Sequence, residues 1–187
     1  MNIFEIDTSE LKTKIPEIRA GDTVILSGIA YTSRDAAHKR IFGMLDAGQE
    51  PPYPIDGSTI YYAGPTPAKP GRAIGSVGPT TSGRMDPFTP RLLGMGLAAM
   101  IGKGERSQEV VEAIMQNHAI YLCAIGGAGA LYSRCIEQAE EIAFGDLGCE
   151  SVKRLRLKNF KTIAAIDMYG GNLFASGKNF YAKRELL

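Results

Sequence analysis

The sequence is poor in the residues that most often bind metals or build a catalytic triad. Its three cysteines, Cys123, Cys135 and Cys149, are widely spaced and form no CxxC pair. This argues against zinc or ferredoxin-type iron–sulfur ligation by the chain alone. We expect them to be small buried hydrophobic residues in a reducing compartment. The only histidines are His38 and His118, and no nucleophile elbow accompanies them. The chain therefore looks like half of an active site.

Charge of one sign and long apolar runs are also lacking. The net charge is +1, so no global field favours nucleic acid or an anionic membrane as a partner. The longest apolar stretch, residues 92–101, contains Gly94 and Gly96 and is too short to cross a bilayer. Residues 1–7 carry acids and lack a signal-peptide pattern. These features predict a cytoplasmic protein that binds neither nucleic acid nor membranes.

What is present is enough sequence for one domain with a core. The chain has 187 residues, of which 44% are hydrophobic and 22% charged. We expect residues 1–187 to form a single domain of the α/β class. Alternating and apolar runs predict strands at residues 23–27, 59–63, 73–77, 119–125, 141–144, 152–160 and 162–168. Helical spacing predicts helices at residues 33–48, 87–100 and 107–118, and a short helix up to residue 138.

Two of these helices carry capping signals at their starts. Thr32 is the expected N-cap of the first helix, with Asp35 at its third helical position as in a capping box. Ser107 is the expected N-cap of the helix over residues 107–118.

Residues 78–86, Gly-Pro-Thr-Thr-Ser-Gly-Arg-Met-Asp, are the most informative segment of the chain. They contain three hydroxyls, an arginine and an acid, with almost no apolar side chain. Such a segment cannot build a core, but it can form a tight turn that presents N–H groups, hydroxyls and a guanidinium to a small anion. From the residues alone, an ordinary surface turn is an equally good interpretation.

A second cationic cluster lies at the start of the helix over residues 33–48. Arg34 and His38 share a helical stripe with the apolar Ile41 and Leu45. Two groups that can carry positive charge repel each other at the positive pole of a helix unless an anion lies there. The alternative is that Arg34 pairs with a core carboxylate and His38 is a structural histidine. The residues support both interpretations about equally.

Lys103 adds a third cation within the Gly-Lys-Gly of residues 102–104. A solvated lysine is the simpler interpretation of this residue alone. A phosphate-binding P-loop does not fit, because five residues separate Gly96 from Gly102 and Gly104 stands where Ser or Thr is required. Residues 126–129 lack the dinucleotide-binding fingerprint. We predict that the three cationic segments converge on a small polycarboxylate.

Several segments resemble, in the same order, motifs of the β subunit or C-terminal domain of class I fumarate hydratases, which are iron–sulfur hydro-lyases. The matching segments are residues 28–40, 62–65, 78–86, 102–104, 125–130 and 147–150. The resemblance covers residues 21–176, which is most of the chain.

The resemblance implies a swivelling β/β/α domain and the reversible hydration of fumarate to (S)-malate. It also implies a separate α subunit, in a heterotetramer with this chain, whose own cysteines hold a [4Fe–4S] cluster with one iron open as a Lewis acid. The site residues it implies are the carboxylate-binding Arg34, Arg84, Lys103, Thr81 and Ser82, the general base Thr80, and the supporting catalytic residues Asp35 and His38.

Two other functions remain open. One is the β subunit of L-tartrate dehydratase, which has the same architecture and a related 2-hydroxy diacid as substrate. The run of residues 83–86 and the pair Ala36-Ala37 are more similar to fumarate hydratases, whose substrate lacks tartrate's second hydroxyl. The other is a non-catalytic assembly module whose glycine-rich loops serve only for docking.

Overall fold

The fold is an α/β domain built on one sheet. The computed structural model describes residues 1–182, apart from the side chains of Asn179 and Tyr181. The strands are β1 (Ile3–Asp7), β2 (Thr23–Thr32), β3 (Thr59–Tyr61), β4 (Ala99–Gly102), β5 (Ile120–Cys123), β6 (Ile136–Ala143) and β7 (Val152–Ile166). The α-helices are α1 (Leu11–Lys14), α2 (Asp35–Asp46), α3 (Thr89–Gly94), α4 (Gln108–Gln116), α5 (Gly129–Tyr132) and α6 (Leu173–Ala182). Short 3₁₀ turns are η1 (Ile15–Glu17), η2 (Ser82–Met85), η3 (Ser133–Cys135) and η4 (Gly145–Glu150).

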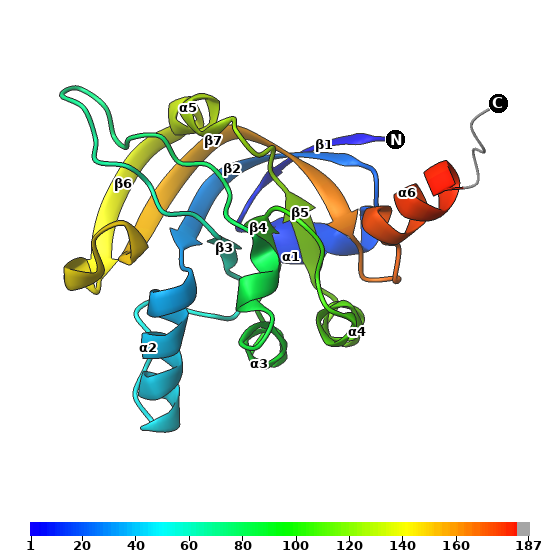
Figure 1. The fold of residues 1–187 in the computed structure, drawn as a ribbon, viewed down its shortest axis with the longest axis horizontal. Coiled ribbons are helices and arrows are strands. Elements are labelled where there is room, and N and C mark those ends of the chain that lie inside the picture. Colours follow the sequence, from blue (N-terminus) through cyan, green and yellow to red (C-terminus); the bar gives the residue numbers. More distant parts are fainter. Residues whose placement is uncertain (183–187) are drawn as a thin grey trace.

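The sheet closes into a small barrel through the long strand β7 (Figure 1). Strands β1 to β5 pair in parallel in chain order. Strand β7 pairs antiparallel with both β5 and β2, which completes a ring of β2, β3, β4, β5 and β7. Strands β1 and β6 extend this ring at β2 and β7. Closure of this kind removes exposed sheet edges from the five ring strands.

Two hydrophobic clusters occupy the two faces of the sheet. Successive residues of the central parallel strands alternate between them, so that Tyr61 and Ile101 belong to one cluster, and Ile60 and Met100 to the other. The second cluster also contains apolar residues of α2, α3 and α4, the helices that lie together below the sheet in Figure 1. Both faces are thus buried, as is usual for parallel strands.

Several predicted elements are confirmed. Strand β2 includes residues 23–27, and α2, α4 and β5 lie within their predicted ranges. Ser107 is the N-cap of α4, and its hydroxyl accepts a hydrogen bond from Val110 N at 3.4 Å. Among the described residues, no helix is long and apolar enough to cross a membrane.

Other predicted elements were wrong. The range 87–100 contains the short helix α3 and then the start of strand β4. The helix ends at Gly94, and Gly96 has a positive φ. The apolar run that follows has no periodicity that distinguishes a strand from a helix. Residues 73–77 form no strand; they belong to a loop in which Thr66 N donates to Ser76 O. The two strands predicted at 152–160 and 162–168 are the single strand β7.

Three local expectations also need correction. Thr32 is not the cap of α2: it is buried, and its hydroxyl accepts a hydrogen bond from Lys153 N. The N-cap position belongs to Arg34, whose side chain makes no capping bond. The expected short helix ends before strand β6, which begins at Ile136. The cysteines are not a buried set, because Cys149 is exposed and the other two are only partly buried.

The core of the barrel should be sensitive to truncation at β7. Leu155 is fully buried and pairs with Ala30 of β2 and Ala139 of β6. Leu155→Ala should lower the free energy of unfolding by about 2–5 kcal/mol, measured by urea denaturation, because it leaves a cavity between three strands. The exposed neighbour Arg154 is the control, and Arg154→Ala should change stability by about 0.5 kcal/mol or less. Equal effects of the two variants would contradict this assignment of the core.

Candidate active site

The candidate site lies where three neighbouring parallel strands end. Thr32 at the end of β2 pairs with Tyr61 of β3, and Tyr61 pairs with Ile101 of β4. Strand β2 leads into α2, β3 into the loop that carries residues 78–86, and β4 into Lys103. The three cationic segments of the sequence therefore leave the sheet at one edge. The carboxyl ends of parallel strands are the usual location of ligand sites in α/β folds.

Backbone hydrogen bonds fix the loop between the extensions of β3 and β4. Thr80 N donates to Tyr62 O at 2.7 Å, and Ser82 N donates to Lys103 O at 2.9 Å. Lys103 N in turn donates to Thr80 O at 3.3 Å. These bonds place Thr80 and Thr81 beside Lys103, as the sequence predicted for the loop and the third cation.

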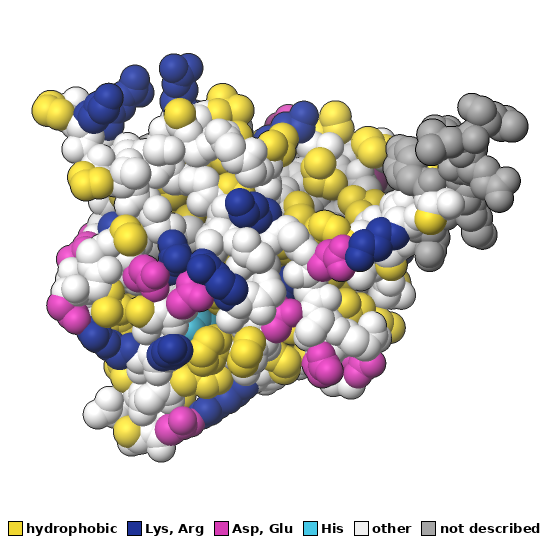
Figure 2. All heavy atoms as spheres, in the orientation of Figure 1, with side chains coloured by type: hydrophobic (Ala, Val, Ile, Leu, Met, Phe, Trp, Pro, Cys, Tyr) yellow, Lys and Arg dark blue, Asp and Glu magenta, His cyan; other side chains and the backbone are white. Residues whose placement is uncertain are grey.

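Arg34 and Arg84 meet at one carboxylate oxygen. Asp35 Oδ2 lies 3.2 Å from Arg34 Nε and 3.1 Å from Arg84 Nη2. Arg84 Nη2 also donates to Thr80 Oγ1 at 2.6 Å. Basic and acidic side chains gather over this part of the molecule, beside the start of α2, in Figure 2. The structure thus joins the two arginines that the sequence placed 50 positions apart, with a carboxylate of the chain itself, Asp35, between them.

A second carboxylate, from the 3₁₀ segment η4 that packs on α2, reaches the same arginine. Glu150 Oε1 of η4 lies 3.3 Å from Arg34 Nη2. Sequence reasoning gave Glu150 no role beyond its place in a matching motif, because nothing in the residues around it shows that η4 packs on α2.

The remaining predicted ligands differ in exposure. Lys103 and Thr81 are exposed, and no acid of the described residues pairs with Lys103. Ser82 is fully buried, and its hydroxyl accepts a hydrogen bond from the Tyr121 hydroxyl at 2.9 Å. Ser82 therefore anchors the loop from below, while Lys103 keeps its ammonium group available to a ligand.

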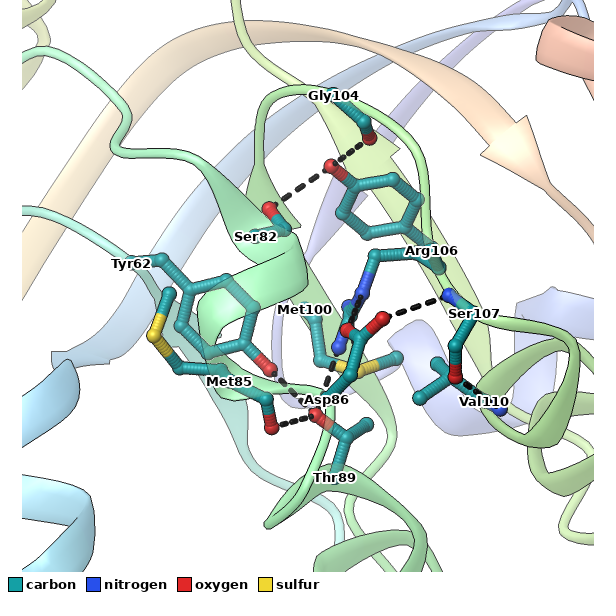
Figure 3. A network of polar contacts seen from close by, with 11 residues as sticks. Tyr62, Ser82, Met85, Asp86, Thr89, Met100, Gly104, Arg106, Ser107 and Val110 are labelled. Atoms are coloured by element: carbon teal, nitrogen blue, oxygen red, sulfur yellow. Dashed lines mark hydrogen bonds and ion pairs between the residues drawn. The ribbon is translucent and has the colours of Figure 1, made fainter.

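A buried ion pair under the loop holds η2 in place (Figure 3). Arg106 Nε donates to Asp86 Oδ1 at 2.7 Å, and Arg106 Nη2 donates to the Thr89 hydroxyl at 2.7 Å. The other oxygen of Asp86 accepts from Ser107 N at 2.6 Å. The Arg106 side chain is completely buried, so this network must be well satisfied. Sequence analysis did not identify Arg106. The only signal for it was the acidic residue Asp86 at the end of residues 78–86, which needs a basic partner if it is buried.

His38 is buried and uncharged at neutral pH. Burial lowers the pKa of its imidazole from 6.5 to about 4, although the Arg34 carbonyl and Asp35 oppose that shift. Its Nδ1 lies 2.9 Å from the Ser33 hydroxyl and 3.2 Å from Arg34 O. A carbonyl only accepts, so Nδ1 carries the proton. His38 therefore does not add positive charge to the site, and it acts on Arg34 through the backbone.

The residues that could bind a metal do not assemble here. Within residues 1–182, no group of three or more His, Cys, Asp or Glu residues is placed to hold a metal ion. The cysteines lie in three separate elements, since Cys123 ends β5, Cys135 ends η3 and Cys149 lies in η4. The described part of the chain thus does not fit an iron–sulfur cluster.

The low pKa of His38 predicts a pH dependence of stability. Because the unfolded imidazole takes up a proton near pH 6.5 and the folded one only near pH 4, protons favour the unfolded state as the pH falls through this range. Between pH 7 and pH 4, this coupling should remove about 3 kcal/mol of unfolding free energy. In the His38→Gln variant, the unfolding free energy measured by urea titration at several pH values should lack this part of its pH dependence.

The exposed His118 provides the matched control. Asparagine tolerates its positive φ of 51°, so His118→Asn should keep the pH dependence of the parent protein. If His38→Gln and the parent lost stability in parallel with falling pH, His38 would not be the titrating group.

Comparison with known proteins gives the family. The model of the Fumarase C-terminus family matches residues 1–177. The chain is 34% identical over 167 residues to the anaerobic class I fumarate hydratase of Escherichia coli, covering 88% of this chain and 30% of that protein. It is 38% identical over 151 residues to the mitochondrial fumarate hydratase 1 of Leishmania major, covering 80% of this chain and 28% of that protein.

A relative of similar length has a different name. The chain is 33% identical over 179 residues to a putative L(+)-tartrate dehydratase subunit beta of Methanocaldococcus jannaschii, and the match covers 92% of each. By contrast, the chain spans only about 30% of the length of the fumarate hydratases that it matches. With a family model that matches nearly its whole length, this chain belongs to the Fumarase C-terminus family.

Proposed function

We propose that this chain is the β subunit of a two-subunit class I fumarate hydratase and helps to hydrate fumarate reversibly to (S)-malate. The observation that carries the proposal is the meeting of Arg34 and Arg84 at Asp35 Oδ2, beside a loop whose Lys103 forms no ion pair within residues 1–182. Together these three cations suit a dianion with two carboxylates. Arginine forks bind both oxygens of a carboxylate and fix its orientation.

The charge on the substrate rises during the reaction. Removal of a proton next to a carboxylate places about two negative charges on that end of malate in the transition state. Fixed guanidinium and ammonium groups stabilise this charge more than that of the ground state. Thr81 adds an exposed hydroxyl beside these cations, and Ser82 keeps their loop in place.

We assign the general base to Thr80. A neutral alcohol is a poor base, so the assignment needs a group that stabilises the alkoxide. Arg84 supplies one, since its Nη2 lies 2.6 Å from Thr80 Oγ1. Asp35 orients both guanidiniums, and His38 holds the backbone of Arg34 through its carbonyl. Their roles are therefore to support Arg34, Arg84 and Thr80.

The rest of the enzyme is part of the proposal. A partner α subunit, in a heterotetramer with this chain, would hold the [4Fe–4S] cluster, since the described residues here do not fit it. We further propose that the domain is of the swivelling β/β/α type. Support for a separate partner subunit comes from the match to the putative tartrate dehydratase subunit beta, which covers 92% of each chain.

A second candidate function is dehydration of L-tartrate, which the match over 92% of each chain favours. Turnover of malate and of L-tartrate by the assembled complex distinguishes the two diacids. We expect malate to be the better substrate by kcat/KM. Faster turnover of L-tartrate would replace the fumarate assignment while leaving the carboxylate site in place.

The arginine pair should be essential for turnover. Arg34→Lys and Arg84→Lys keep the charge but lose the fork, and each should lower kcat/KM of the complex by about 10- to 100-fold. Arg91→Lys is the matched control, because Arg91 is exposed on α3 and contacts Asp46 and the Phe42 ring rather than the site. Full activity of both site variants would favour a non-catalytic assembly module.

A further inference from the structure

The start of α2 depends on a side chain from a distant part of the chain. The first N–H groups of a helix have no partner within the helix and need acceptors from elsewhere. The N-cap residue Arg34 has extended backbone angles and supplies no capping bond. Instead, Ala36 N donates to Glu150 Oε2 at 2.8 Å, across 114 positions of sequence. A carboxylate at this pole is also favoured by the helix dipole.

The other oxygen of the same carboxylate reaches the guanidinium. Glu150 Oε1 lies 3.3 Å from Arg34 Nη2, and the two side chains are only 24% and 19% exposed. At the opposite end of the guanidinium, Nε contacts Asp35. The backbone at Gly64 limits the third side, because a Cβ there would lie 2.8 Å from Arg34 Nη1. The guanidinium is therefore held from three directions.

Asp35 and Glu150 are not equivalent holders of Arg34. Asp35 Oδ2 is shared between Arg34 and Arg84, so an incoming carboxylate that binds both guanidiniums competes directly with it. Glu150 contacts Arg34 but not Arg84, and its second oxygen is fixed on the helix backbone. It can keep Arg34 in place while Asp35 yields to the ligand.

We propose that Glu150 is a positioning residue, which holds Arg34 in the orientation that binds a substrate carboxylate. Its relevance to turnover rests on the function proposed above. Glu150 lies in η4, between β6 and β7, so the antiparallel hairpin next to β2 completes a site formed at the ends of the parallel strands. Preorganisation of this kind lowers the cost of ordering a long side chain when the substrate binds.

Two variants of Glu150 separate positioning from general packing. Glu150→Gln keeps one oxygen, which can accept from Ala36 N or from Arg34 but not from both at these positions, whereas Glu150→Ala removes both contacts. The control is Asp146→Ala, because Asp146 ties the same η4 to α2 through Arg40, at 2.7 and 2.8 Å, without contacting Arg34. In the assembled complex, Glu150→Ala should raise KM for malate about tenfold, with kcat within about threefold of the parent. Glu150→Gln, which keeps one of the two acceptors, should restore part of the lost affinity, and Asp146→Ala should leave KM unchanged.

A second measurement tests positioning without turnover. In the ¹⁵N-labelled full chain, we expect solvent exchange of the Arg34 Nε–H to be about tenfold faster in Glu150→Ala than in the parent or in Asp146→Ala, because one contact of the guanidinium is lost. Glu150→Gln, which keeps one acceptor, should give an intermediate rate. The Arg34 signal is assigned by its loss in Arg34→Lys. Unchanged exchange in Glu150→Ala would overturn the proposal, as would an equal rise in KM in Asp146→Ala.

The two proposals fail in different ways. If the assembled complex hydrates neither diacid but exchange responds as expected, the positioning role stands and the hydro-lyase function falls. If turnover is found and Glu150→Ala changes neither KM nor exchange, the function stands and Glu150 is only a surface acid.

Discussion

One carboxylate oxygen, Asp35 Oδ2, lies between the guanidiniums of Arg34 and Arg84, and the rest of the site depends on this contact. Partly exposed ion pairs contribute little to stability on their own. Arg84 is nearly half exposed, so the contact cannot by itself bring the two segments together. The backbone beneath it must do so, and the carboxylate then keeps two like charges close in the absence of a ligand.

The backbone does this by the order of the strands. Strands β2, β3 and β4 are neighbours and run parallel, so the three segments that follow them begin at the same edge. Below the loop, the buried Asp86–Arg106 pair fixes η2 from the side of α4. Above it, bonds between Thr80, Ser82 and Lys103 tie the loop to the end of β4. The described residues hold cationic side chains in place but form no metal-binding group. This arrangement suits a subunit that completes a site formed with a partner.

Sequence reasoning found the site better than it found the elements. The meeting of Arg34 with Arg84 could be predicted because polar residues that cannot build a core must serve another purpose; anion binding by residues 78–86 stays a prediction. Strand β4 was missed because Ala99–Gly102 is buried on both faces, and such a run shows no period that separates strand from helix. The true cap of α2 could not be predicted, because Glu150 reaches it through tertiary packing alone. His38 was ambiguous for a related reason: its charge state depends on burial, which the sequence does not state.

The central claim is that Arg34 and Arg84 bind one dicarboxylate together. A crystal structure of the assembled enzyme with a bound non-reactive dicarboxylate, such as succinate, tests it most directly. We predict that both guanidiniums contact that one molecule and that Asp35 Oδ2 no longer bridges them. A ligand that contacts only one of the two arginines, or that binds away from the ends of β2, β3 and β4, would contradict this account.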